Sequence, residues 1–323
     1  MHDPTYRQAL VSAWRHTFRH PGLWLLGLFA AILGQMGIFE LLSQAFLSVA
    51  NGPLFESFIS SPSVSVWRLA WDGSASSGPQ VWVWVAWLIV AAGAAAIFFL
   101  CLAVISQGAL IFAAAKGLKR GDIAIGQAWS AGGTHFWRLF FLNFIRKFFT
   151  MILVTIVGMS ALLAMTAGTI GAKLLFLALF SLAVVFGMII SFLVMYAAGY
   201  IVVEEYALVE SLHAAWRLFL RHWLVSFEVG IIFVFANFVL IALAMAGFLL
   251  ILIPVSLLNV LAAVTASAIL SSFSTYILFF LFVCLIMFLG AVFTVFSTSA
   301  WTYLFMKMHR EGVKSRLLHW MRA

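Results

Sequence analysis

Between Glu228 and Lys307 the chain contains no charged residue. A helix needs about 20 apolar residues to cross the roughly 30 Å hydrocarbon core of a bilayer, so this stretch is too long for a single crossing. Pro254 and the Ser, Asn and Thr residues of segment 255–275 interrupt its apolar character. The stretch therefore predicts two membrane-spanning helices divided at Pro254, with a re-entrant or an interfacial segment at 255–271 as the alternatives between them.

The rest of the chain has the same character. Only 9% of the 323 residues are charged and 65% are hydrophobic, with a mean hydropathy of +1.14, whereas soluble domains carry roughly 25% charged residues. The apolar runs are continuous, which favours helices over the alternating strands of a membrane barrel. We predict an all-α polytopic membrane helix bundle with six spans, at 21–39, 81–116, 148–172, 174–203, 229–253 and 274–306.

The distribution of Lys and Arg predicts the orientation. Six crossings place sixteen of the eighteen basic residues on one side of the membrane, and leave only Arg68 and Lys173 on the other. Basic loops stay in the cytoplasm, so both termini are predicted to be cytoplasmic. The net charge of +8 then indicates attraction to anionic lipid headgroups, and not to nucleic acid.

One short motif occurs three times, each time just before a predicted span. It is an Ala-Trp pair with a histidine six residues after the Trp. We interpret the motif as marking three homologous units, each an amphipathic helix followed by two spans, which makes the repeats parallel. The motifs are Ala13-Trp14 with His20, Ala128-Trp129 with His135, and Ala215-Trp216 with His222; within one membrane domain, 1–323, the units are 3–116, 121–203 and 204–308, followed by a short basic tail at 309–323.

The first and third of these segments have the pattern of amphipathic helices. Such helices lie in the membrane interface, with the apolar face in the acyl boundary, Trp as an anchor, and cations toward the headgroups. The opposed faces are Tyr6, Leu10, Val11, Trp14 and Phe18 against Arg7, Ser12, Arg15 and Arg19, and Leu208, Val209, Leu212, Trp216, Phe219 and Leu220 against Glu210, His213, Arg217 and Arg221.

Two placements have alternatives. The three motif histidines would bind a metal or an anionic headgroup if they converged on a pseudo-threefold axis, but we expect them to be spread around the cytoplasmic rim, with no metal or cofactor. A span that starts at Phe136 would embed two cations, whereas a start at Phe148 puts them at the interface, which we predict. The candidate headgroup and interface residues are Trp14, Arg15, Arg19, His20, Trp129, His135, Arg146, Lys147, Trp216, Arg217, Arg221 and His222.

The stretch from Tyr200 to Trp223 resembles a signature of a broad bacterial membrane-protein superfamily. That superfamily includes the membrane domain attached to some glycerophosphoryl diester phosphodiesterases. The similarity implies the fold of about residues 5–308 and a place in the bacterial cytoplasmic membrane. No phosphodiesterase domain accompanies the helices here, so it implies no reaction. The matching positions are Glu204 or Glu205, Ala207-Leu208 and Trp216-Arg217, and the segment from Ser106-Gln107-Gly108-Ala109-Leu110 through Trp137-Arg138-Leu139-Phe140 is similar to the preceding repeat.

No catalytic pattern is evident in the sequence. There is no His-Glu-x-x-His pair, no Gly-x-Ser-x-Gly elbow, no phosphate-binding loop and no pair of cysteines at ligand spacing. Three function classes remain: a non-catalytic protein that organises lipids or partner proteins, a transporter or permease component without a buried proton relay, and an enzyme. We predict the first, with membrane lipids as partners; the sequence indicates neither a protein partner nor an oligomeric state.

Overall fold

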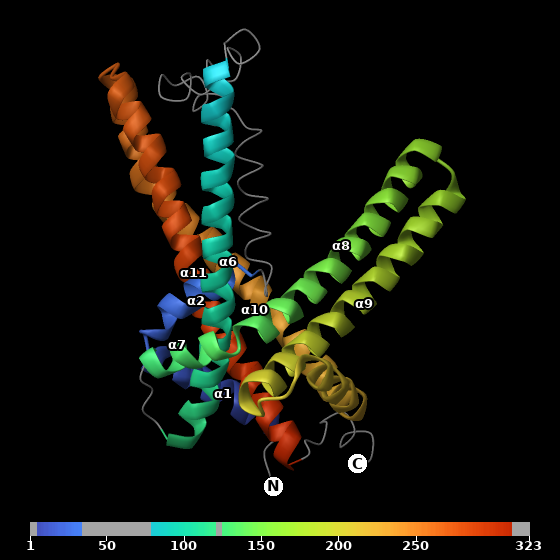
Figure 1. Cartoon of the computed structure of the whole chain (residues 1–323). Coiled ribbons are helices and arrows are strands. Elements are labelled where there is room, and N and C mark those ends of the chain that lie inside the picture. Colours follow the sequence, from blue (N-terminus) through green and yellow to red (C-terminus); the bar gives the residue numbers. More distant parts are fainter. Residues whose placement is uncertain (1–4, 34–78, 121–124, 312–323) are drawn as a thin grey trace, which may run out of the picture.

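The computed structural model describes residues 5–33, 79–120 and 125–311. All regular structure in these ranges is α-helical, as predicted (Figure 1). The helices are α1 (Thr5–Arg19), α2 (Leu23–Ala31), α6 (Pro79–Arg120), α7 (Ile125–Thr134), α8 (Phe136–Ala167), α9 (Ile170–Val203), α10 (Leu208–Val264) and α11 (Ala268–Glu311).

Five of these helices, α6 and α8 to α11, are long and apolar enough to cross a membrane. The chain is therefore a multi-pass integral membrane protein. The predicted first span at 21–39 begins with α2, and most of its second half lies outside the described residues. Gly168, in the left-handed conformation with φ 62°, ends α8, and the Thr169 hydroxyl caps α9 by accepting a hydrogen bond from the Ala172 N–H.

The predicted division at Pro254 is wrong. Helix α10 continues through Pro254 to Val264, and the chain turns at 265–267, where Ala266 has a φ of 48°. Segment 255–264 is thus part of the helix and not a connection between two helices. Proline is tolerated within membrane helices because neighbouring helices and local adjustments satisfy the freed backbone groups, and α11 packs against α10.

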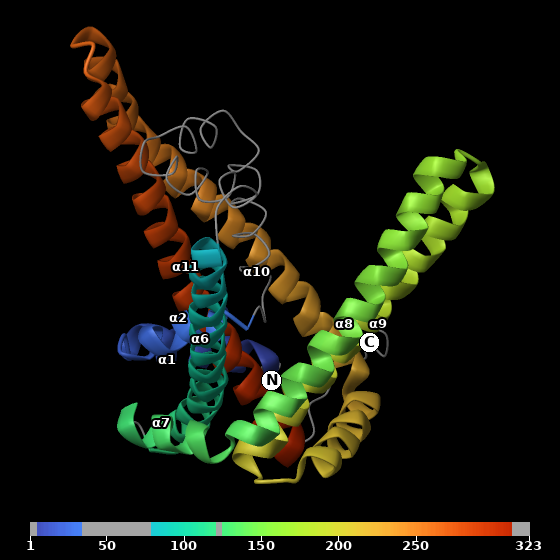
Figure 2. The same ribbon diagram turned by 45° about the horizontal axis from the view of Figure 1, so that its top comes forward.

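Buried side chains are concentrated at one end of the bundle, which we call the base. The base comprises α1, α2, α7, the first part of α10, and the adjoining ends of α6, α8, α9 and α11. Beyond it the α8/α9 and α10/α11 hairpins diverge as two arms (Figures 1 and 2). Between residues 149 and 190 only Ser160 and Ala172 are buried. The arms therefore present apolar side chains outward, as lipid-facing helices do.

Candidate membrane-interface site

Each motif histidine follows a short helix and lies at a break before the next helical segment. His20 separates α1 from α2, and His135, with φ −100° and ψ 9°, separates α7 from α8. His222, with φ −128° and ψ 29°, is the one non-helical position inside α10. The sequence pattern thus marks three equivalent local positions. Residues 208–221 form a short helix of the same kind as α1 and α7.

The alanine before each motif Trp is fully buried. Ala13, Ala128 and Ala215 are each 0% exposed. The Trp side chains differ: Trp14 is 57% and Trp216 45% exposed, whereas Trp129 is only partly exposed. A small residue at the contact point lets each short helix approach the base closely.

The short helix α1 has three faces, where the sequence indicated two. The face that the sequence pattern did not indicate is buried against α11 and consists mainly of small or short side chains. Its members are Ala9, Ala13 and Thr17, together with His16. Trp14 and Phe18 form the exposed aromatic face, and their rings contact each other at a centroid distance of 4.7 Å. The third face is exposed and basic. The four-residue spacing of small side chains was the signal that could have revealed the buried face.

The first part of α10 repeats this arrangement. Its buried face is again rich in small residues, namely Ser211, Ala214, Ala215 and Leu218. Of the predicted basic face, Arg217 and Arg221 are exposed, as are Arg15 and Arg19 on α1. Exposed cations therefore lie beside an exposed Trp on both helices.

Each short helix packs on a long helix that ends at the base. Helix α7 packs on α6, where Lys116 Nζ donates to Gln127 Oε1 at 2.5 Å. Helix α1 packs on α11, where Lys307 Nζ donates to Gln8 Oε1 at 2.8 Å. The first part of α10 packs on α9, where the Phe219 ring stacks on that of Phe192.

The two cations on α8 have different surroundings. The helix is continuous from Phe136, so both lie within it. Arg146 is partly buried, and its Nη2 donates to the carbonyl oxygen of Leu33 at 2.6 Å, just beyond the end of α2. Lys147 is exposed. One turn earlier, the buried Asn143 Nδ2 donates to Gln107 Oε1 at 2.6 Å, which joins α8 to α6.

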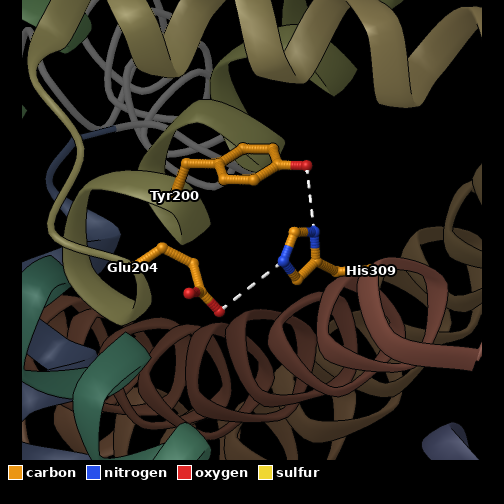
Figure 3. A network of polar contacts seen from close by, with 3 residues as sticks. All are labelled: Tyr200, Glu204 and His309. Carbon is orange, nitrogen blue, oxygen red and sulfur yellow. Dashed lines mark hydrogen bonds and ion pairs between the residues drawn. The ribbon is translucent and has the colours of Figure 1, made fainter.

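A polar network not predicted from the sequence ties the end of α11 to the α9–α10 loop (Figure 3). The Tyr200 hydroxyl lies 3.3 Å from His309 Nδ1, and His309 Nε2 lies 3.9 Å from Glu204 Oε1. The Tyr206 ring stacks on that of Tyr200. From α8, Arg138 Nη1 donates to the Glu205 carbonyl oxygen at 3.1 Å, so the loop is held from two sides.

His16 is the buried titratable group of α1. Its ring lies 5.2 Å from that of His20 and 6.0 Å from that of Tyr303. Burial, and then the neighbouring His20, lower the pKa of His16 to about 4. The residue is therefore neutral at pH 7. Within the described ranges, no group of three or more His, Cys, Asp or Glu side chains is placed to hold a metal ion.

No protein-family model matches the chain, and no curated protein or solved structure is detectably similar to it.

Proposed function

We propose that this membrane protein organises lipids, or partner proteins at the lipid surface, by binding anionic headgroups at its base, and that it is not an enzyme. One observation carries the proposal. On α1 and on the first part of α10, an exposed Trp lies beside two exposed Arg side chains while the opposite face is buried. Aromatic rings favour the membrane–water interface and cations favour the anionic headgroups.

Further exposed aromatic side chains support an interface at the base. Large aromatic residues are unfavourable in water but suit the headgroup level of a bilayer. Their number is high where α8 and the second part of α10 leave the base. The exposed members are Trp137, Phe141 and Phe144 on α8 and Trp223 and Phe227 on α10.

The packing of the short helices supports the three-unit organisation, which remains part of the proposal. In units 121–203 and 204–308 the short helix packs on the last helix of the unit before it. In unit 3–116 the short helix packs on the last helix of the third unit. These contacts join the three units in a closed ring, as expected for parallel homologous units. Membership in the phosphodiesterase-associated superfamily is proposed on the sequence likeness alone.

The interior of the base favours an organising protein over a transporter. Its buried side chains form a packed and mostly apolar core, and the short helices lie around that core. A transporter would require a polar route through this region.

The length of the α8/α9 arm supports a cytoplasmic base. Residues 148–167 span about 30 Å at a rise of 1.5 Å per residue, which equals the hydrocarbon thickness. Arg146 and Lys147 would then lie at one interface and Lys173, near the tip, at the other. Because basic residues concentrate on the cytoplasmic side, we place the base, and both termini, in the cytoplasm of a bacterial cell.

Cysteine labelling tests this orientation. In a background with Cys101 and Cys284 replaced, single cysteines are introduced at Thr265, at the tip of the α10/α11 arm, and at Ser130 on α7; both positions are exposed. An impermeant thiol reagent should label Thr265→Cys in intact cells and Ser130→Cys only after lysis. The opposite pattern would contradict the orientation.

Lipid binding tests the proposed function. Two double variants are made, Arg15→Gln/Arg19→Gln on α1 and Arg217→Gln/Arg221→Gln on α10. Each should weaken binding of the purified protein to vesicles containing phosphatidylglycerol by about 25-fold, because each cation near an anionic surface contributes about 1 kcal/mol. Vesicles of phosphatidylcholine alone provide the baseline. The matched Arg→Lys pairs keep the charge and should bind as the unmodified protein does. Unchanged binding in both Gln pairs would refute the headgroup role.

A further inference from the structure

Two adjacent cations lie where the α8/α9 arm leaves the base. Leu142 and Asn143 are buried in the base, whereas side chains from Lys147 through Met151 are exposed. Between them Arg146 is partly buried and fixed by its hydrogen bond to the Leu33 carbonyl oxygen. We call Arg146 and Lys147 the root pair. They lie on a different helix from the cations of the short helices.

No carboxylate of the described residues forms an ion pair with the root pair; the ion pair found in those ranges joins His309 to Glu204. A guanidinium held beside apolar side chains loses much of its hydration, and an anion at hydrogen-bonding distance restores that stabilisation. The bond to Leu33 uses one of the five N–H donors of Arg146. Guanidinium geometry suits phosphate, so the other N–H donors of Arg146 can donate to the oxygens of a phosphate group.

The surroundings of the root pair suit acyl chains. Phe144, Phe148 and Phe149 are 60%, 54% and 47% exposed. Past them the arm exposes only apolar and hydroxyl side chains as far as Ala167, and it diverges from the α10/α11 arm (Figure 2). One leaflet of a bilayer, about 15 Å of hydrocarbon, corresponds to roughly ten residues of helix, so the chains of one lipid would reach about residue 157.

We propose that the root pair binds one anionic phospholipid, with the phosphate on Arg146 and Lys147 and the acyl chains along the exposed side of the α8/α9 arm. The inference rests on the proposed function but assigns a discrete site, separate from the short helices. Arg146 contributes a fixed donor set, because Leu33 holds it. Lys147 contributes a mobile second charge from the exposed surface.

Native mass spectrometry of the full chain tests the site. The protein is extracted from bilayers of equal phosphatidylglycerol and phosphatidylcholine, and the retained lipids are counted. The double variant Arg146→Gln/Lys147→Gln should lower the preference for phosphatidylglycerol at the tightest site by about 25-fold. The single variant Lys147→Gln changes only an exposed side chain and should lower that preference by about fivefold. Lys173→Gln, at the far end of the same arm, should leave it unchanged. An unaltered preference in Lys147→Gln and in the double variant would overturn the proposal.

Two further experiments distinguish a bound lipid from free phosphate, and the root pair from the short helices. Millimolar inorganic phosphate should not displace the retained lipid, because the acyl contacts contribute to binding; complete displacement would overturn the lipid assignment. The Arg15→Gln/Arg19→Gln protein retains the root pair and should keep its tightly bound lipid even as its vesicle binding falls. Loss of that lipid in this variant would mean that the root pair is no separate site.

Discussion

Replacing Gly132 with alanine is expected to destabilise the purified protein by about 3 kcal/mol or more, at the upper end of overpacking substitutions. A Cβ atom at Gly132 would lie 2.2 Å from the Ile105 carbonyl oxygen and 2.9 Å from the Ala109 nitrogen. Both atoms belong to the backbone of α6, so no side chain can move to accept the methyl group. Helix α7 must shift away from α6, which weakens the buried contacts of Ala128. Thermal unfolding in detergent measures the loss.

The adjacent glycine provides a matched control. Gly133 is also in α7, and a Cβ atom there would meet nothing within 4 Å. Gly133→Ala should therefore raise stability slightly, by up to about 1 kcal/mol, because alanine favours the helix. Equal effects of the two substitutions would show that close packing of α7 on α6 does not stabilise the base.

The second large effect is a pH dependence caused by His16. Its pKa is lowered from 6.5 to about 4 by burial and by the charge of His20. Below pH 6.5 the unfolded chain therefore binds a proton that the folded chain does not, so the free energy of unfolding falls as the pH drops from 6.5 to about 4. The full loss is about 3 kcal/mol. Chemical denaturation at pH 7.5 and at pH 4.5 measures most of this decrease in the free energy of unfolding.

A substitution isolates His16 from the carboxylates that also titrate in acid. His16→Gln lowers stability at neutral pH but should show a smaller decrease between pH 7.5 and 4.5 than the unmodified protein. His213→Gln is the control, because His213 is exposed on the first part of α10. It should leave the pH dependence as it was. An identical pH dependence in all three proteins would exclude His16 as the cause.

The helical membrane class was predictable because the long uncharged runs are also continuously apolar. The apolar run between Glu228 and Lys307 is long enough for two crossings, so two helices were expected there. The turn between them was placed incorrectly. Proline is a reliable helix terminator in water but not in a membrane, and the real turn, Thr265-Ala266-Ser267, contains neither Gly nor Pro.

The candidate site was predictable only in part, for a similar reason. Periodicity identified the exposed aromatic and basic faces of α1 and of the first part of α10, because those faces lie within one helix. It missed the buried face of Ala9, Ala13 and Thr17, since alanine and threonine give a weak hydropathy signal. The Tyr200–His309 contact joins residues 109 positions apart, and no local pattern reports such a pair.

The packing of α1 on α11 has a consequence for how the protein is made. Translation proceeds from the N-terminus, so α1 leaves the ribosome before every other described helix, whereas α11 follows all of them. The buried face of α1, including His16, therefore lacks its contacts with α11 during most of synthesis, and the Lys307–Gln8 hydrogen bond can form only when α11 has been inserted. The base is therefore completed only when α1, the first of the described helices to be made, packs against α11, the last of them.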